Sequence, residues 1–302
     1  MSAFLLSCNA TPSSTVKKQE EQQDKSPVFK MVSIPSILAT PEERAEYLVK
    51  NYWNNFDFSD TIYVDNEDVT EQAFVNYIDI LPHTNYEIAN ASIKKTIEKA
   101  STEKKMVDYF FSLYEKYFYD ANSPMRNDEL FIPVLEGIIA SPAYEEAEKI
   151  RPQNLLHLAL KNRVGEKAND FTFTLKNGQK QSLYKQKAKY LLVYFYNPGC
   201  PACKETSTKM KASQVISSAL SDKTLKVLAV YPDEDLEEWK KYLNDIPENW
   251  ISGYDQDVYL KNEEIYDLKA IPTLYFLDQD KKVIFKDANF EQIEAYLLQN
   301  KQ

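Results

Sequence analysis

Apolar residues recur at every third or fourth position across residues 31–164, a spacing that predicts amphipathic helices. The first helix begins at Thr40, where a capping residue is followed by a proline and two glutamates. Thr70 is expected to cap the second helix. The other apolar patterns predict three more helices, at residues 106–117, at about 128–140 with an interruption at Pro133, and around 155–160. We therefore expect a separate, mainly α-helical N-terminal domain.

From Gly165 onward the pattern changes to short alternating or continuous apolar runs, which are typical of β-strands. Residues 171–175 alternate and resume at 181–184 after a turn at Gly178, so they predict a hairpin. A continuous apolar run at 189–196 suits a central strand buried on both faces. Later patterns alternate in type: a helix at 204–220, a strand at 226–230, a helix at about 233–243, a hairpin of 274–277 with 283–285, and a helix at about 290–298. Together they predict a compact α/β domain, a central sheet flanked by helices, over residues 165–302.

Length and composition fit this division into two domains. The 302 residues are 43% hydrophobic and 27% charged, which is ordinary for folded protein. A net charge of −10 gives no electrostatic reason to bind nucleic acid, so no such partner is expected. Most of the excess negative charge lies in residues 31–164, which hold 13 basic and 22 acidic side chains. We interpret it as a solvated acidic face, with an electrostatic docking surface as the alternative.

The sequence excludes several kinds of site. With only 5 glycines, it contains neither a dinucleotide-binding fingerprint nor a phosphate-binding loop. The 2 histidines, His83 and His157, are isolated from other ligand types, so we interpret both as structural and expect no metal. Aromatic residues at helical spacing in the N-terminal domain are interpreted as core rather than as a ligand cage: Tyr109, Phe110, Tyr114, Tyr117 and Phe118.

The N-terminal segment contains a possible targeting motif. Residues Leu5-Leu6-Ser7-Cys8 resemble a bacterial lipobox, in which Cys8 would be the lipidated residue. The polar residues that follow cannot bury enough surface to fold, so residues 1–30 are expected to combine a truncated lipoprotein signal with a flexible tether. A frayed terminus with a stray thiol is the alternative. No run of 18 apolar residues predicts a transmembrane helix.

The chemistry of the chain is concentrated in Cys200-Pro201-Ala202-Cys203, between a predicted strand and a predicted helix. A sulfur at a helix N-terminus meets unpaired N–H groups and the positive end of the helix dipole, which favour the nucleophilic thiolate. Pro201 is tolerated because the first helical turn does not use its N–H. Cys203 lies close enough to attack a mixed disulfide on Cys200, which is the arrangement for thiol–disulfide exchange.

Three other interpretations of the cysteine pair have less support from the sequence. A zinc site needs about four ligands, and no second pair of cysteines or histidines supplies them. A structural disulfide across so short a loop would give little stabilisation. A peroxidatic cysteine of the peroxiredoxin kind would want threonine three residues before Cys200, where Asn197 stands. We therefore favour redox catalysis.

A second motif supports this interpretation. Ile271-Pro272-Thr273 precedes a predicted strand and resembles the cis-proline loop of thioredoxin-fold proteins, although a trans proline at a strand start is the alternative. In that family the loop packs beside the cysteines, and the backbone of the residue before the proline pairs with the substrate chain. The resemblance implies this role for Ile271, a form of β-augmentation.

More closely, residues 165–302 resemble the TlpA/ResA branch of thioredoxin-like proteins. The matching segments are Gly165, Phe171 to Leu175, Gly178, Ser182-Leu183, Cys200 to Cys203 and Val227 to Leu243. The helical half is similar to an uncharacterised domain that precedes such domains in envelope lipoproteins. The resemblance implies an extracytoplasmic disulfide reductase or exchanger attached to a membrane, with no cofactor beyond a redox-active disulfide between Cys200 and Cys203.

The sequence departs from typical thioredoxins at two positions. Tyr194 stands where thioredoxins carry a buried aspartate, and Gly199 replaces the usual tryptophan. The base that would deprotonate Cys203 is therefore unassigned, because a helix would turn the nearby Glu205 outward. No imidazole lies between the cysteines to stabilise a thiolate, which argues against an extreme oxidant.

The leading hypothesis is a membrane-tethered oxidoreductase in a bacterial cell envelope, facing the periplasm or exposed at the surface. It would act in the reductive direction on protein thiols and disulfides and would receive electrons from an upstream thiol donor. The alternative is a lipoprotein scaffold or binding module whose thioredoxin domain senses redox state or is not catalytic. A third hypothesis is a peroxidase, which would consume hydrogen peroxide.

Overall fold

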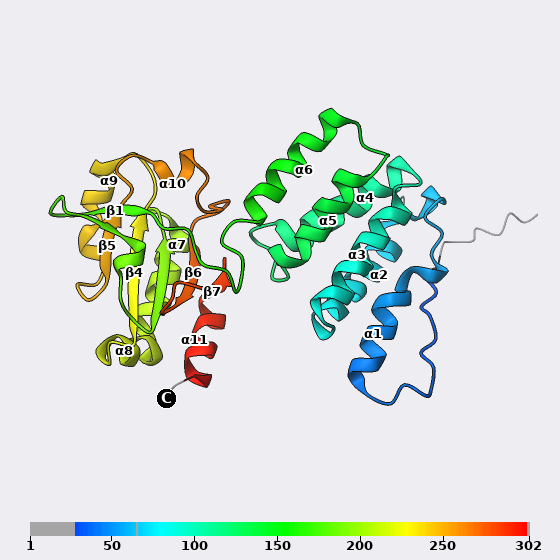
Figure 1. The fold of residues 1–302 in the computed structure, drawn as a ribbon, viewed down its shortest axis with the longest axis horizontal. Helices are drawn as coiled ribbons and strands as arrows, with labels where there is room; N and C mark the ends of the chain where they lie inside the picture. The colour runs from blue at the N-terminus through cyan, green and yellow to red at the C-terminus, as the bar shows by residue number, and fades with distance from the viewer. Residues whose placement is uncertain (1–27, 65, 301–302) are drawn as a thin grey trace, which may run out of the picture.

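The computed structural model describes residues 28–64 and 66–300, which form a helical domain and a sheet-containing domain side by side (Figure 1). Cys8, the rest of the predicted lipobox and nearly all of the predicted tether lie outside the described residues. None of the helices within the described residues is long and apolar enough to cross a membrane.

The described part of the helical domain contains six α-helices and four short 3₁₀ or π segments. The α-helices are α1 (Pro41–Asn51), α2 (Glu67–Ile80), α3 (Tyr86–Ala100), α4 (Lys104–Tyr114), α5 (Asp128–Ala140) and α6 (Glu146–Ala159). The short segments are η1 (Tyr52–Asn55), η2 (Thr61–Tyr63), η3 (Leu81–His83) and η4 (Glu115–Tyr119). Helix α1 begins as predicted, because the Glu43 N–H donates to the Thr40 hydroxyl and the Thr40 N–H donates to the Glu43 carboxylate, both at 3.1 Å.

Two predictions for this domain are wrong. Thr70 does not cap α2, which begins one turn earlier, directly after Asn66. The Thr70 side chain is instead buried and donates to the Tyr63 carbonyl at 2.7 Å. Pro133 does not interrupt α5, because it lies in the second turn and packs into the core, so that only one backbone hydrogen bond is lost.

Helix α3 was not predicted from the sequence, although it lies at the centre of the domain and packs against α5. Its buried stripe includes Ser92 and Thr96 among the apolar residues, so the hydrophobic spacing is interrupted. Both hydroxyls have hydrogen-bond partners. Thr96 donates to the Ser92 carbonyl at 2.8 Å, and Ser92 donates to the Val49 carbonyl at 2.7 Å. Burial of these polar groups is tolerated because each has a partner.

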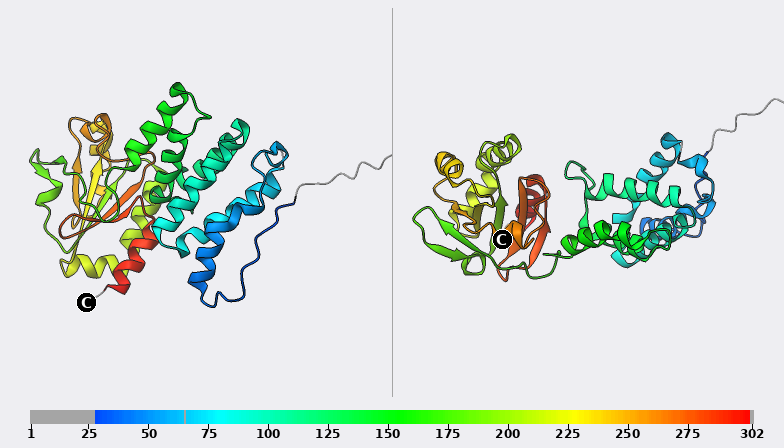
Figure 2. Two further views of the ribbon diagram at one scale, coloured as in Figure 1. Left: turned by 45° about the vertical axis from the view of Figure 1, so that its right-hand side comes forward. Right: turned by 90° about the horizontal axis from the view of Figure 1, so that it is seen from above.

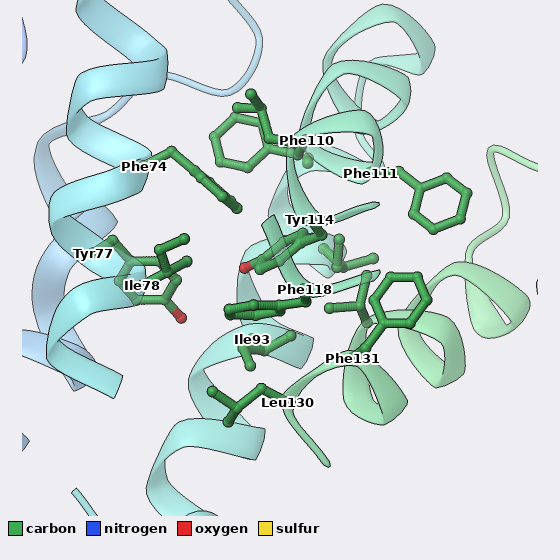
Figure 3. Close-up of a cluster of buried hydrophobic side chains, with 14 of the residues drawn as sticks. Phe74, Tyr77, Ile78, Ile93, Phe110, Phe111, Tyr114, Phe118, Leu130 and Phe131 are labelled. Carbon is green, nitrogen blue, oxygen red and sulfur yellow. The ribbon is translucent and has the colours of Figure 1, made fainter. Parts of the chain in front are cut away.

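The predicted aromatic stripe lies in the core of the helical domain (Figure 3). Phe110, Tyr114 and Phe118 are fully buried, and Tyr109 and Tyr117 pack at the edge of the same cluster. The ring of Tyr114 meets that of Phe74 edge to face, with 4.7 Å between centroids. These aromatic side chains hold the helices together rather than lining a ligand cage.

The C-terminal domain is built on a seven-stranded sheet in the order β2-β1-β5-β4-β3-β6-β7. Its strands are β1 (Thr172–Leu175), β2 (Lys180–Ser182), β3 (Tyr190–Phe195), β4 (Leu225–Tyr231), β5 (Ile251–Tyr254), β6 (Thr273–Asp278) and β7 (Val283–Lys286). Strands β3, β4 and β5 are parallel, and the other pairings are antiparallel. The central position of β3, buried on both faces, confirms the interpretation of its continuous apolar run.

Helices and a long loop cover the two faces of this sheet (Figures 1 and 2). The main helices are α7 (Pro201–Ala212), α8 (Gln214–Ser221), α9 (Leu236–Lys241) and α11 (Phe290–Gln299), and they pack on one face. The other face is covered by segments around β1 and by α10 (Tyr259–Asn262) with the chain that follows it. The short 3₁₀ helices η5 (Leu183–Lys185) and η6 (Leu243–Asp245) complete the domain.

Three details of this domain differ from the sequence predictions. The helix expected at 204–220 begins at Pro201 and is broken at Ser213, whose hydroxyl accepts from the Ile216 N–H and starts α8. Helix α9 is shorter than expected. Strand β5 was missed because it is four residues long and contains Gly253, which has low strand propensity.

Candidate functional site

Cys200 lies at the N-cap of α7, at the end of the short loop that follows β3. Gly199, at φ +75°, makes the turn, because a left-handed conformation suits glycine. The Cys203 N–H donates to the Cys200 sulfur at 3.3 Å, so this sulfur occupies the place of a capping oxygen. Pro201 is the first residue of the helix, and both Pro201 and Ala202 are exposed. Cys200 is half-buried and carries a free thiol.

Cys203 is the buried partner, with 3% of its surface exposed, and it packs on the helix-covered face of the sheet. Burial raises the pKa of its thiol to about 12, although the backbone N–H of Asn197 donates to the sulfur at 3.5 Å and partly offsets this effect. The two thiols therefore differ in accessibility, as expected for an attacking and a resolving sulfur.

The Ile271–Pro272 loop lies directly against the Cys200 sulfur. The Cys200 thiol donates to the Ile271 carbonyl oxygen at 3.7 Å, and the peptide bond between Ile271 and Pro272 is cis. Thr273 is buried at the start of β6, and its hydroxyl donates to the Ala270 carbonyl. The structure thus brings together all the residues of the two sequence motifs.

Sheet register explains why the two motifs meet. Phe195, the last residue of β3, pairs with Thr273, the first residue of the antiparallel β6. The chain that leaves β3 toward Cys200 and the chain that enters β6 after Pro272 therefore lie at the same edge of the sheet.

Tyr194, at the position of the buried aspartate of thioredoxins, contacts the backbone of Cys203. Its hydroxyl donates to the Cys203 carbonyl at 2.8 Å, and its ring stacks on Tyr196 with 5.3 Å between centroids. Burial raises the pKa of the Tyr194 hydroxyl well above its ordinary value, so this group stays protonated. Among the described residues no carboxylate is hydrogen-bonded to the Cys203 sulfur, and Glu205 is exposed and paired with Lys209.

Asn197 and Asp233 were not predicted as part of the site. The Asn197 side chain donates to the Asp233 carboxylate, which also pairs with Lys261, so the loop whose N–H reaches Cys203 is held in place. Asn197 follows β3 by two residues and Asp233 follows the parallel β4 by two residues. The rule that polar groups at the carboxyl ends of parallel strands converge could have identified the pair.

A cavity of about 480 Å³ opens beside the two cysteines on the side of α7 and η6. Its wall is mixed in character, with aromatic, hydroxyl and ammonium groups that include Tyr196, Ser207, Lys211 and Tyr242. It is large enough for a side chain or a short stretch of peptide to lie beside the sulfurs.

The two histidines lie far from this chemistry in the fold, at the end of η3 for His83 and within α6 for His157, and both are exposed. In the part of the chain that the structure describes, no group of three or more His, Cys, Asp or Glu residues is placed to hold a metal ion. The arrangement consists of an accessible sulfur, a buried sulfur one helical turn away and an adjacent backbone carbonyl.

Comparison with known proteins agrees with this fold. Residues 164–286 match the AhpC/TSA family, and residues 7–162 match a domain of unknown function, DUF5106. A thioredoxin-like protein from Bacteroides caccae is 50% identical, with a TM-score of 0.88 over 90% of this chain and 98% of that one. The chain therefore belongs to the thioredoxin-like family, with a DUF5106 domain preceding its thioredoxin-fold domain. This confirms the expected fold and the expected uncharacterised helical domain.

Two further solved structures each cover less than half of this chain. The C-terminal domain of an uncharacterised protein from Bacteroides fragilis is 50% identical, with a TM-score of 0.45 over 45% of this chain and 98% of that one. The thioredoxin domain of a thiol-disulfide oxidoreductase from Bacteroides vulgatus is 23% identical, with a TM-score of 0.41 over 46% and 99% of the two chains. A comparison with curated proteins found no match.

Proposed function

We propose that this protein is a thiol–disulfide oxidoreductase of the TlpA/ResA-like kind that reduces disulfides in other proteins. The observation that carries the proposal is the placement of the Cys200 sulfur. It caps a helix, lies 3.7 Å from the Ile271 carbonyl and has a second, buried thiol one turn behind it. A nucleophile, a resolving group and a backbone contact for substrate are the three parts that the reaction requires.

The reaction proceeds in two exchanges. The Cys200 thiolate attacks one sulfur of a substrate disulfide, which breaks the substrate S–S bond, releases one substrate thiolate and forms a mixed disulfide. Cys203 then loses its proton and attacks the Cys200 sulfur, which releases the second substrate thiolate and forms the Cys200–Cys203 disulfide. Two electrons and two protons have passed to the substrate. An upstream thiol donor restores the dithiol, and the redox-active cysteine pair is the only cofactor required.

Substrate recognition would rest on the backbone of Ile271 and on the cavity beside the cysteines. Main-chain hydrogen bonds bind an extended chain with little regard to its sequence, so substrates would be protein segments that carry an accessible disulfide. The raised pKa of Cys203 favours its neutral thiol in the reduced protein, so Cys203 must lose a proton before it attacks the mixed disulfide.

Trapping of the mixed disulfide tests the proposal. In a Cys203→Ala variant the intermediate on Cys200 should accumulate when reduced protein is mixed with insulin, and it should disappear on addition of dithiothreitol. A Cys200→Ser variant is the matched control and should form no such adduct. Failure of Cys203→Ala to form an adduct, or hydrogen peroxide consumption much faster than insulin reduction, would reject this function. Full biological activity of Cys200→Ser would favour the scaffold alternative.

We further propose that the protein is an envelope lipoprotein anchored through Cys8, with a tether over residues 1–30, a helical domain over 31–164 and a thioredoxin-like domain over 165–302. This proposal rests on the lipobox resemblance and on the polar composition of the segment that follows it. Detergent-phase partitioning of the full chain expressed in a Bacteroides host tests it, with Cys8→Ala as the control. Equal recovery of both forms in the aqueous phase would contradict lipidation.

A further inference from the structure

A cluster of buried charges joins the helical domain to the segment that carries Ile271 and Pro272. Asp128, the first residue of α5, places one carboxylate oxygen 3.0 Å from the ammonium of Lys269 and the other 2.9 Å from that of Lys286. The side chains of these three residues are 12%, 10% and 4% exposed, respectively. Ion pairs this deeply buried are weakly screened by solvent, so removal of one partner leaves an uncompensated charge.

Lys269 is fixed at both ends, and it lies only two residues before Ile271. Its backbone N–H donates to the Asp267 carboxylate at 3.2 Å, and its ammonium contacts the other oxygen of the same carboxylate at 3.2 Å. From the helical domain, Asp128 pairs with this ammonium, which also lies over the ring of Tyr119, 4.6 Å from the centroid.

The residues before Lys269 are held by the connection between the domains. Lys161 donates to the carbonyls of Glu263 and Glu264, and Asn162 donates to that of Ile265 at 2.9 Å. Residues 263–269 are therefore attached to the helical domain and its linker, whereas Ile271 faces the Cys200 sulfur. We call residues 263–272 the substrate loop.

We propose that the helical domain positions the substrate loop for thiol exchange and that Asp128 is the positioning residue through which it acts. This inference rests on the proposed function. The Asp128 carboxylate holds Lys269, and Lys269 fixes the backbone that leads to the Ile271 carbonyl. Helix α5 is a rigid support because Phe131 and Leu135, on its buried face, are fully enclosed. The helical domain would thus contribute to substrate binding without touching the sulfurs.

The adjacent residue, Glu129, provides a matched control. It also lies at the start of α5 and forms an ion pair, in which its two carboxylate oxygens lie 3.1 and 3.2 Å from Nε of Arg163. Arg163 belongs to the linker and not to the substrate loop. Asp128→Asn and Glu129→Gln each replace one ion-paired carboxylate at the start of α5 by its amide, but only the first removes a contact to the loop.

Steady-state reduction of insulin, with dithiothreitol as electron donor, tests the inference. Asp128→Asn should raise KM for insulin by about tenfold, the size expected from one weakened main-chain hydrogen bond, and should leave kcat within about twofold. Glu129→Gln should leave both constants within about twofold of the unmodified protein. An equal rise in KM for the two variants, or no rise for Asp128→Asn, would overturn the assignment.

A second measurement tests the inference without depending on enzymatic activity. Backbone hydrogen exchange over residues 266–272 should accelerate in Asp128→Asn and not in Glu129→Gln, and unchanged exchange in Asp128→Asn would contradict positioning. If the unmodified protein reduces no disulfide, the proposed function fails, whereas the exchange result still decides whether Asp128 holds the loop. Lys269→Met replaces Asp128→Asn if that variant does not fold, and the same loop-specific increase is expected.

Discussion

The sulfur of Cys200 lies 3.7 Å from the carbonyl oxygen of Ile271, although the two residues are 71 positions apart in the sequence. The contact follows from the antiparallel pairing of β3 and β6, which brings the end of one strand to the start of the other. A substrate chain that pairs with the backbone at Ile271 would therefore present its disulfide to Cys200. Binding and nucleophilic attack would then take place at the same edge of the sheet.

The difference in accessibility between the two cysteines predicts selective alkylation. Reduced protein treated with iodoacetamide at pH 7 should be modified at Cys200 first, because Cys203 is 3% exposed and burial raises its pKa to about 12. Cys203→Ala should be alkylated at a rate similar to the unmodified protein, and Cys200→Ser at least about tenfold more slowly. Mass spectrometry of the labelled peptides measures both rates. Preferential labelling of Cys203 would contradict the assigned roles.

The hydrogen bond from Tyr194 to the Cys203 carbonyl predicts a modest structural contribution. Tyr194→Phe should lower the free energy of unfolding by about 1 kcal/mol, the net value of a neutral hydrogen bond, because the carbonyl keeps its helical partner. Tyr196→Phe is a suitable control, since the Tyr196 hydroxyl is buried and makes no hydrogen bond of ordinary geometry to the described residues. Urea unfolding measures both values. A loss for Tyr196→Phe equal to that for Tyr194→Phe would show that the hydrogen bond is not the cause.

Much of the sheet domain and of its site could be predicted because the relevant patterns are local. Cys200 to Cys203 follows an uninterrupted apolar strand, and Ile271-Pro272-Thr273 directly precedes another, so the type and order of the elements were sufficient. Helix α3 could not be predicted as readily, because buried hydroxyls interrupt its apolar spacing.

Contacts between distant segments explain the rest of what was missed. Asp128 and Lys269 are 141 residues apart, and nothing in the sequence distinguishes either one from an ordinary surface charge. Only the packing of α5 against the loop before β6 buries them and makes their pairing necessary. The pairing of Asn197 with Asp233 likewise depends on the register of parallel strands, which cannot be derived from the sequence.

Close packing at Gly253 predicts that β5 tolerates no side chain there. A Cβ atom at this position would lie 2.6 Å from a ring carbon of Phe173, well inside van der Waals contact. Gly253→Ala should therefore lower the free energy of unfolding by about 2 kcal/mol, as is typical of overpacked cores. Ser252→Ala, on the same strand, removes a buried hydroxyl that makes no hydrogen bond of ordinary geometry to the described residues and should change stability little. Equal unfolding midpoints for Gly253→Ala and the unmodified protein would exclude the clash.

Asp287, between β7 and α11, predicts a pH-dependent stability of unusual sign. Burial raises the pKa of its carboxyl from 3.8 to about 6, although the charges of Arg126 and Lys269 act in the opposite direction. Between about pH 4 and pH 6 the folded state therefore binds a proton that the unfolded state has lost. The contribution of Asp287 to stability falls as pH rises through this window and is constant above it. Asparagine tolerates the left-handed backbone at this position, φ +50°, so Asp287→Asn preserves the fold.

The free energy of unfolding of the unmodified protein, minus that of Asp287→Asn, should fall between pH 4 and pH 6.5 by up to about 3 kcal/mol.

Asp128→Asn is a control of opposite sign. Burial alone would raise the pKa of Asp128, but Lys286 and Lys269 outweigh it and hold that pKa below the ordinary value. The stability that Asp128 itself contributes is therefore lost only as pH falls below about 4. The Asp128 charge also raises the pKa of Asp287, so its removal should shift the Asp287 window to lower pH. Urea unfolding at constant ionic strength measures both curves. A difference for Asp287→Asn that is flat or rises with pH would show that this carboxyl is ionised throughout the range.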